Sequence, residues 1–210
     1  MMIKEQKVNV PELRILRSHT VLIVGLGSVG SAVAHVVAPF VNLLLLCDHD
    51  KVEPKNSNNQ FLHPITNSQM FKSQSASKTL NSYFTTPTVP ITAPIQQVAS
   101  NIAKNYQQLS VIFDCVDNAE ARAFIYSCPE FSNKYIVHTA ISHDGFQYAV
   151  IKPGDEETRK ILTQIYSNPP KQNQPEAPCH ILRNIYVAYA CAFASVGELC
   201  KVLGGEHERD

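Results

Sequence analysis

Hydrophobic residues in this chain gather in short runs that are apolar at most positions rather than at every second one. Residues 21–24 and 111–116 are such runs, and residues 41–47 are apolar except for Asn42. A strand whose hydrophobicity is continuous is covered on both faces, which is typical of a parallel sheet. The pattern therefore predicts three central strands with helices packed on both sides of them.

The segments between these runs favour helices. Residues 28–37 are small and apolar on several sides, which suits a helix packed against a sheet, and Pro39 ends it. Further helices are expected over 68–83, 99–108 and 119–128, and further strands over 89–92, 135–139 and 147–151. Pro90 places 89–92 at a sheet edge or strand end. The alternation predicts an α/β fold with a Rossmann-like, doubly wound, mainly parallel sheet.

Three other stretches differ in composition. Residues 48–67 are polar and rich in Asn and Pro, so we expect a loop there. Residues 152–178 include two polar runs that contain proline, 152–157 and 169–175, and predict a mobile loop or partly ordered insert. A last helix over 181–203 is expected to end at Gly204 and Gly205 as a C-cap. We divide the chain into an N-terminal segment (1–17), one domain (18–205) and a frayed tail (206–210).

Composition narrows the class of protein. The chain has 210 residues, of which 44% are hydrophobic and 17% charged, which is enough for one well-packed domain. The formal net charge is zero, so we expect no bulk attraction to nucleic acid or anionic membrane. Uninterrupted apolar stretches are shorter than the roughly 18 residues of a membrane span, and the first twenty residues lack a signal-peptide pattern. We therefore expect a cytoplasmic protein.

A glycine motif follows the first predicted strand. Gly25, Gly27 and Gly30 form a GxGxxG pattern, in which the first glycine permits a tight turn, the second lets phosphate approach, and the third allows close helix packing. Asp48 and Asp50 end the second strand about 20 residues later, where an acidic group binds ribose. These features predict a nucleotide site and by themselves favour an NAD-dependent oxidoreductase. The alternative is a glycine turn that binds nothing.

The residues after the second strand resemble a family signature. The ThiF/MoeB/HesA family, related to ubiquitin-activating enzymes, carries Asp-x-Asp-x-Val-x-x-x-Asn-x-x-Arg-Gln, with a Lys twelve residues after the Gln. The corresponding residues here are Asp48, Asp50, Val52, Asn56, Asn59, Gln60 and Lys72. Asp114, Asp117, Asn118 and Arg122 resemble the family's Asp-x-x-Asp-Asn-x-x-x-Arg, and residues 138–147 and 198–201 are also similar. The resemblance covers about residues 18–205 in one continuous order.

The resemblance implies an adenylyltransferase that binds ATP and Mg²⁺ and activates the C-terminal carboxylate of a small ubiquitin-like or sulfur-carrier protein or peptide. It implies that Asp48 or Asp50 holds the ribose, that Asn56 and Lys72 contact phosphate, and that Asp117 binds Mg²⁺. Attack of a carboxylate on the α-phosphorus needs positioning and charge neutralisation rather than an enzyme nucleophile. Simpler interpretations remain: Lys72 as a solvated lysine, Asp117-Asn118 as a helix cap, and Asn56 as a loop residue.

Asn59 departs from the family pattern, which has a phosphate-binding arginine at this position. An amide offers only neutral donors, and one lost charge-assisted hydrogen bond costs about 1.5–3 kcal/mol. Three hypotheses follow: weak activity, a substitute cation from Arg14, Arg17, Lys55 or a partner, or a binding or regulatory subunit without catalysis. The N-terminal stretch also lacks the arginine segment that family dimers exchange.

The six cysteines are scattered and include no CxxC pair. We expect reduced thiols, with Cys47 and Cys115 as small buried hydrophobes, and no zinc site. Relatives that form a thioester or persulfide use a cysteine after the last long strand, which makes Cys179, beside His180, the candidate thiol; an unreactive thiol is the alternative. The resemblance also implies a homodimer or a pseudo-symmetric heterodimer.

Overall fold

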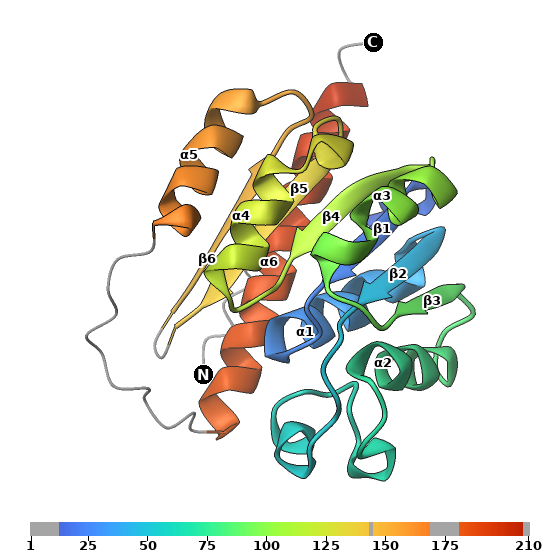
Figure 1. The fold of residues 1–210 in the computed structure, drawn as a ribbon. Helices are drawn as coiled ribbons and strands as arrows, with labels where there is room; N and C mark the ends of the chain where they lie inside the picture. Colours follow the sequence, from blue (N-terminus) through green and yellow to red (C-terminus); the bar gives the residue numbers. More distant parts are fainter. Residues whose placement is uncertain (1–12, 143–144, 169–180, 208–210) are drawn as a thin grey trace, which may run out of the picture.

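The computed structural model describes residues 13–142, 145–168 and 181–207, and a six-stranded sheet forms its centre (Figure 1). The strand order is β3-β2-β1-β4-β5-β6. Strands β1 to β5 pair in parallel, and β6 runs antiparallel to β5. The strands are β1 (Thr20–Val24), β2 (Leu43–Cys47), β3 (Thr88–Ile91), β4 (Leu109–Asp114), β5 (Tyr135–Ile141) and β6 (Phe146–Ile151). This topology confirms the predicted doubly wound, mainly parallel sheet.

Helices cover both faces of the sheet (Figure 1). One layer holds α1 (Ser28–Val37), α2 (Lys72–Asn81) and α6 (Ile181–His207), and the other holds α3 (Ile95–Asn105), α4 (Ala119–Ser127) and α5 (Glu156–Ser167). In β1, Val21 and Ile23 pack into the first layer, whereas Leu22 and Val24 pack into the second. Two hydrophobic cores therefore account for the continuous apolar pattern of the strands.

The strand order places a crevice at the carboxyl ends of β1 and β4. Helix α1 leaves β1 toward one face of the sheet, and α4 leaves the neighbouring β4 toward the other. Ligands of open α/β sheets bind at such a switch point because the two connections diverge there.

Short 3₁₀ helices occupy several connections. They are η1 (Leu13–Ser18), η2 (Ala38–Phe40), η3 (Pro54–Asn58), η4 (Ile65–Asn67) and η5 (Pro129–Phe131). Leu16 of η1 is fully buried in the core that contains α6, so the predicted N-terminal segment contributes to the domain. The polar connection after β2 was predicted as a loop, and it contains η3 and η4.

Two helix starts differ from the sequence prediction. Helix α2 begins at Lys72 rather than at residue 68, because Gln69 has a positive φ of 71°, which a helix does not accept. Helix α3 begins at Ile95, directly after Pro94, rather than at residue 99. Pro90 lies on β3 at the sheet edge, as its missing N–H requires, so that prediction is confirmed.

The prediction of a mobile or partly ordered insert over 152–178 is wrong for its first half. Residues 156–167 form α5, where Asp155 caps the helix by accepting a hydrogen bond from the Thr158 N–H at 3.0 Å. The guanidinium of Arg159 is buried and donates to the carbonyls of Phe131 (3.0 Å) and Cys128 (3.1 Å). These long-range contacts order a segment whose flanking prolines had suggested a loop. Residues 169–178 lie outside the described part of the chain.

The predicted C-cap at Gly204 and Gly205 is also wrong, because α6 continues through both glycines to His207. A glycine cap needs a left-handed backbone, and among the described glycines only Gly25 and Gly154 have a positive φ. Glu206 and His207, predicted as tail, therefore belong to the helix, and residues 208–210 lie outside the described residues.

Helix α6 meets the length and composition of a membrane span over Ile185–Gly205, although its uninterrupted apolar runs are short. About half of this segment is buried inside the protein. Ala188, Cys191 and Ala192 lie in the same hydrophobic core as Val33 and Val37 of α1. A core helix passes the same composition test, and this burial is the arrangement expected of one.

Candidate nucleotide-binding site

The turn between β1 and α1 has the geometry that its glycine spacing predicts. Gly25 has a φ of +85°, and a Cβ there would lie 2.7 Å from the Cys115 carbonyl oxygen. A Cβ on Gly30 would lie 1.9 Å from the Gly25 carbonyl oxygen, so a side chain would separate the turn from the helix. A Cβ on Gly27 would meet no atom within 4 Å. The turn is therefore closed at its ends and open at its middle glycine.

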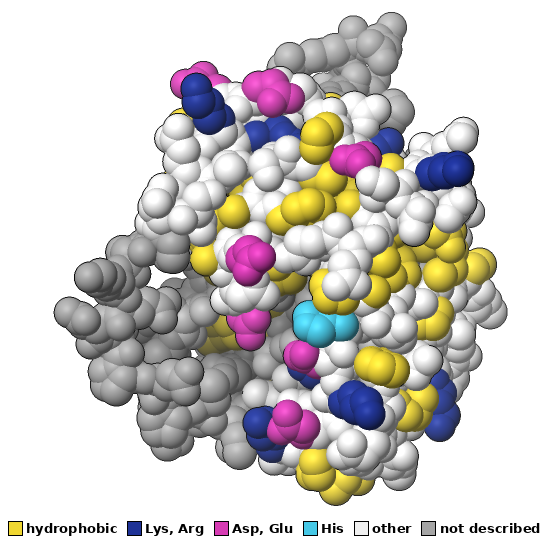
Figure 2. Space-filling view, in the orientation of Figure 1, with side chains coloured by type: hydrophobic (Ala, Val, Ile, Leu, Met, Phe, Trp, Pro, Cys, Tyr) yellow, Lys and Arg dark blue, Asp and Glu magenta, His cyan; other side chains and the backbone are white. Residues whose placement is uncertain are grey.

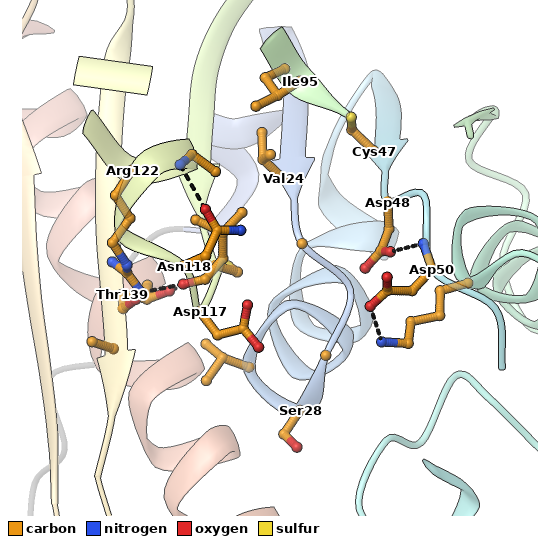
Figure 3. A pocket seen from close by; sticks show the side chains of 18 of the residues that line it. Val24, Ser28, Cys47, Asp48, Asp50, Ile95, Asp117, Asn118, Arg122 and Thr139 are labelled. Carbon is orange, nitrogen blue, oxygen red and sulfur yellow. Dashed lines mark hydrogen bonds and ion pairs between the residues drawn. The ribbon is translucent and has the colours of Figure 1, made fainter. Parts of the chain in front are cut away.

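Helix α1 directs its positive end into this opening. Its N-cap is Gly27, which has no side chain to bond the first N–H groups of the helix. The first turn of an α-helix leaves backbone donors free, and its dipole favours an anion there. Ser28 begins the helix on the pocket side in Figure 3. The open backbone at Gly27 and the first N–H groups of α1, which have no partner within the helix, together suit a phosphate group.

Asp48 ties the end of β2 to the glycine turn. One carboxylate oxygen accepts from the Leu26 N–H at 2.7 Å and the other from the Asp50 N–H at 2.8 Å. The side chain is buried, and this burial raises the pKa of Asp48, although the backbone donors oppose the shift. Asp48 lines the pocket, but its observed contacts brace the turn.

Asp50 and Lys72 form an ion pair on the same wall, with 2.9 Å between Nζ and the carboxylate oxygen. Partial burial would raise the pKa of Asp50, but the hydrogen bond and charge of Lys72 outweigh it and hold that pKa below its ordinary value. Lys72 begins α2 and lines the pocket with a side chain that is 12% exposed, whereas that of Asp50 is 58% exposed. Two residues of the sequence signature, Asp50 and Lys72, are therefore in direct contact in the folded protein.

His63 is a second brace of the turn, which the sequence analysis missed. Its Nε2 lies 2.7 Å from the Leu26 carbonyl oxygen, and the ring is fully buried. Burial lowers the pKa of His63 to about 4, although the hydrogen bond to Leu26 opposes the shift. The ring is therefore neutral near pH 7 and donates through Nε2. No motif marks this residue, because its role depends on a contact 37 positions away.

The turn between β4 and α4 supplies the opposite wall. Asn118 caps α4 by accepting from the Ala121 N–H at 2.7 Å, so the capping interpretation is confirmed for this residue. Asp117 is exposed and lines the pocket on the side opposite Asp48 and Asp50 (Figure 3). Its carboxylate is placed to meet a cation in the pocket.

A buried polar network stands behind that turn. Arg122 donates to the Asp114 carboxylate at 2.9 Å, to the Thr139 carbonyl at 2.9 Å, and to the Val116 carbonyl. Tyr126 donates to the same carboxylate, and His138 Nδ1 lies 2.7 Å from Arg122 Nη1. Arg122 therefore links the strand end, the turn and β5.

The three amide residues of the signature take different places. Asn56 is buried and its side-chain oxygen accepts from the Glu53 N–H at 2.7 Å, which closes a capping box on η3; it does not line the pocket. Asn59 and Gln60 both line it. The side-chain oxygen of Gln60 is buried without a hydrogen-bond partner among the described residues. Asn56 thus has a local structural contact, and its predicted phosphate contact stays a prediction.

These walls enclose one pocket of about 990 Å³. Val24, Cys47 and Ile95 line an apolar end, and Asp117 and Asp50 line the polar middle (Figure 3). Lys72, the ion-pair partner of Asp50, also lines the pocket. Acidic side chains and a histidine lie near the middle of this face in Figure 2. Of the described lining residues, Lys72 and Arg122 carry the fixed positive charges, and Arg122 is bound to Asp114.

The residues present fit a magnesium nucleotide. The open Gly27 turn and the helix end suit phosphate, and the apolar end suits a planar base. Mg²⁺ prefers oxygen ligands and keeps several waters, so the exposed carboxylate of Asp117 suffices as a protein ligand. The ligand atoms of Asp48, His49 and Asp50 also lie within 4.8 Å of one another, but Asp48 and Asp50 already have the partners described above.

Four of the five described cysteines are poor nucleophiles. Burial raises the pKa of Cys47 and Cys128 to about 12 and that of Cys191 to about 11, and it also raises the pKa of Cys115. A thiolate is the reactive form, so these side chains behave as buried hydrophobes. Cys179, the predicted candidate thiol, lies outside the described residues.

Solved structures share this architecture. Escherichia coli TcdA, a tRNA N6-threonylcarbamoyladenosine dehydratase, has a TM-score of 0.64 and 18% identity, with 94% of this chain and 91% of that chain covered. The same enzyme is also known in complex with AMP. Escherichia coli MccB, solved with AMPCPP and selenomethionine MccA, has a TM-score of 0.60 and 16% identity over 92% of this chain and 58% of that one. At these identities the likeness shows the fold.

Curated relatives match in sequence as well. Adenylyltransferase and sulfurtransferase uba4 of Neosartorya fischeri is 32% identical over 164 residues, covering 75% of this chain and 32% of the relative. Ubiquitin-like modifier-activating enzyme 5 of Branchiostoma floridae is 30% identical over 154 residues, covering 67% and 38%. The chain therefore spans about a third of the length of these two relatives. The ThiF family model matches residues 3–210, almost the whole chain, and the protein therefore belongs to the ThiF family.

Proposed function

We propose that this protein uses ATP and Mg²⁺ to adenylate the C-terminal carboxylate of a small ubiquitin-like or sulfur-carrier protein or peptide. One observation carries the proposal: a single pocket joins the open glycine turn, Lys72 and the exposed Asp117 at the switch point of the sheet. The names of the ThiF relatives, which include an adenylyltransferase and a modifier-activating enzyme, support the same reaction class.

Each pocket residue has a distinct task in this proposal. The Gly27 turn and the end of α1 orient phosphate through backbone N–H groups, and Lys72 neutralises phosphate charge. Asp117 holds Mg²⁺, which when bound offsets charge on the phosphates. Asp48 and His63 keep the turn in place. Asp50 orients Lys72 in the observed structure and is the freer of the two carboxylates for a ribose hydroxyl.

The far end of the pocket supports a peptide substrate. Thr139, Ser142 and Gln147, which belong to β5, β6 and the connection between them, line the pocket in addition to the residues assigned to the nucleotide. An extended chain end can reach the phosphates from that side while the rest of its protein stays outside. MccB, a structural neighbour, was solved with MccA.

The test is ATP–pyrophosphate exchange with a panel of small carriers that end in Gly-Gly. We expect exchange that needs both Mg²⁺ and a carrier, and a fall of about tenfold to a hundredfold in Lys72→Ala and in Asp117→Ala, because each removes a charge-assisted contact. Lys104→Ala is the control, since Lys104 is an exposed lysine of α3 outside the pocket. Exchange that survives both pocket substitutions would contradict the assigned roles.

Asn59 favours a second candidate, a nucleotide-binding subunit without catalysis. Its neutral amide lines the pocket at the position where the family signature has arginine. Among the described residues that line the pocket, the cations are Arg122 and Lys72. Arg122 is paired with the buried Asp114, whereas the partner of Lys72 is the exposed Asp50. Tight ATP binding with no exchange across the carrier panel is the expected result for this candidate. Asn59→Arg separates the two, because a gain of exchange in that variant supports the catalytic proposal.

An NAD-linked oxidoreductase has no separate support. It depends on the glycine motif and the acidic strand end, and the ThiF signature contains the same acidic pair. Calorimetric titration with ATP and with NAD compares the two ligands directly, and we expect heat of binding from ATP.

We also propose a homodimer or pseudo-symmetric heterodimer through an aromatic surface. This surface comprises His35, Phe61, Tyr83, Phe84, Tyr189 and Phe193, whose rings form a connected series at 4.8–6.4 Å. Phe61, Tyr83 and Phe193 are 46%, 65% and 62% exposed. Large exposed apolar patches mark interaction sites. Sedimentation should show a dimer that Phe193→Ser weakens, whereas Phe146→Ser, an exposed residue of β6, leaves it unchanged.

A further inference from the structure

Helix α5 brings one aromatic side chain, Tyr166, onto the buried network behind the Asp117 turn. The Tyr166 hydroxyl lies 3.4 Å from His138 Nε2, and the Arg122 guanidinium lies 5.3 Å from the centre of the Tyr166 ring. The ring also stacks on Tyr126, with centroids 5.9 Å apart. Tyr166 lines the pocket together with Arg122. It therefore contacts three members of the network and the pocket at once.

Arg122 connects Tyr166 to the turn that carries Asp117. Its Nη2 donates to the carbonyl of Val116, the residue directly before Asp117, and to the carbonyl of Thr139. Its Nη1 donates to the Asp114 carboxylate at the end of β4. A guanidinium that shifts in its plane would loosen its bond to the Val116 carbonyl, and Val116 lines the pocket. The direction of the Asp117 side chain thus depends on how firmly Arg122 is held.

The hydroxyl of Tyr166 adds a directional contact. His138 Nδ1 lies 2.7 Å from Arg122 Nη1, which can only donate, and 3.1 Å from the Asp114 carboxylate, which can only accept. His138 Nε2 lies 3.4 Å from the Tyr166 hydroxyl, which can accept from a protonated Nε2 or donate to an unprotonated one. The ring of Tyr166 holds Arg122 by a cation–π contact, and its hydroxyl orients the histidine that Arg122 bonds.

We propose that Tyr166 is a positioning residue of the nucleotide site, which holds Arg122 and His138 so that the β4–α4 turn presents Asp117 to the pocket. The structural part of this proposal stands on the contacts above. Its consequence for Mg²⁺ rests on the proposed function.

Tyr166→Ala and Tyr166→Phe test the proposal, because the first removes ring and hydroxyl and the second removes the hydroxyl alone. Ile161→Ala is the matched control, since Ile161 lies on the same helix and is 50% exposed, outside the pocket. The first readout is amide hydrogen exchange of residues 114–118 in the nucleotide-free protein. We expect about tenfold faster exchange in Tyr166→Ala, a smaller increase in Tyr166→Phe and no change in Ile161→Ala.

The second readout is calorimetric binding of a non-hydrolysable ATP analogue, with Mg²⁺ and with a chelator. Loss of Asp117 positioning should weaken binding about tenfold with Mg²⁺ and leave binding without Mg²⁺ unchanged in Tyr166→Ala. An equal loss in both conditions, or exchange at 114–118 that matches the wild type, would overturn the proposal. If the wild-type protein binds no nucleotide, the proposed function fails, and hydrogen exchange alone decides whether Tyr166 holds the turn.

Discussion

The two walls of the pocket are built in opposite ways. On the β1–β2 wall, Asp50 and Lys72 pair at 2.9 Å in partial contact with solvent, with side chains 58% and 12% exposed. On the β4–β5 wall, Asp114 and Arg122 pair at the same 2.9 Å with side chains 0% and 8% exposed. Equal distances thus conceal different environments. The first pair can exchange its partner for a ligand, whereas the second pair must stay intact.

This difference separates binding groups from supporting groups. Asp117 is exposed, and Lys72, although its own side chain is only 12% exposed, is paired with a carboxylate that is 58% exposed, so both residues can bind a ligand. Asp114 and Arg122 satisfy each other and neighbouring groups, so their role is to keep the wall in shape. Removing one member of a buried ion pair is strongly destabilising, because the other charge stays buried without its partner.

Removing the cation of each pair tests the comparison with the largest expected effect. Arg122→Leu leaves the Asp114 charge buried without its partner, and we expect a loss of about 3–5 kcal/mol in the free energy of unfolding. Lys72→Leu should cost at most about 1 kcal/mol. Urea unfolding of both variants measures the difference. Equal losses would show that the two walls do not differ in this way.

Acid should act on the β1–β2 wall through His63. The unfolded chain protonates this histidine below its ordinary pKa of 6.5, whereas the folded protein holds the pKa at about 4. The unfolded state therefore binds more protons as pH falls from 6.5 to 4, and stability falls by about 3 kcal/mol over that range. Unfolding of the wild type and of His63→Gln across this range measures it, and the same slope in both would refute the assignment.

Substitutions in the glycine turn are expected to change stability less, and to differ between Gly30 and Gly27. Gly30→Ala places a Cβ 1.9 Å from a backbone oxygen, so we expect a loss of about 1–3 kcal/mol in stability. Gly27→Ala meets no atom within 4 Å and should change stability by no more than about 0.5 kcal/mol, while it weakens binding of the ATP analogue. Thermal unfolding and calorimetry separate the two effects. Normal ATP affinity in Gly27→Ala would place the phosphates elsewhere.

A small effect that depends on salt is expected from Asp50→Asn. The partly exposed ion pair with Lys72 contributes at most about 1 kcal/mol, and added salt screens such pairs. Urea unfolding at low and high salt should therefore show a small difference from the wild type that shrinks as salt is added. A large difference that persists in salt would mean that this pair is buried in solution.

Sequence patterns predicted the parts of the site that local chemistry governs. Gly25 and Gly30 are readable because no other residue fits the turn, whatever the rest of the fold does. Asp48, Asp50 and Asp117 are readable because parallel strands bring their carboxyl ends to one edge of the sheet. The family signature added Lys72, whose spacing alone carries no structural meaning.

Other residues could not be found in this way. Arg159 and Tyr166 lie on α5. This helix was not predicted, because the proline-containing residues at 152–154 and 169–175 on its two sides indicated a loop. His63 is a histidine in a polar stretch until the fold brings Leu26 to it. The glycine pair at 204–205 resembles a helix end but stays helical. In each case, contacts between distant parts of the chain outweighed the local preference.

The sequence by itself determined the sheet, the glycine turn and the charged groups that lie at the carboxyl ends of the strands, because these follow from hydrophobic pattern and backbone sterics. Only the tertiary structure decided which of those groups are already bound to the protein and which remain available. Burial separates the two kinds of group, because a charge that is removed from water needs a partner within the protein. Burial is a property of the assembled fold and cannot be read from the local sequence.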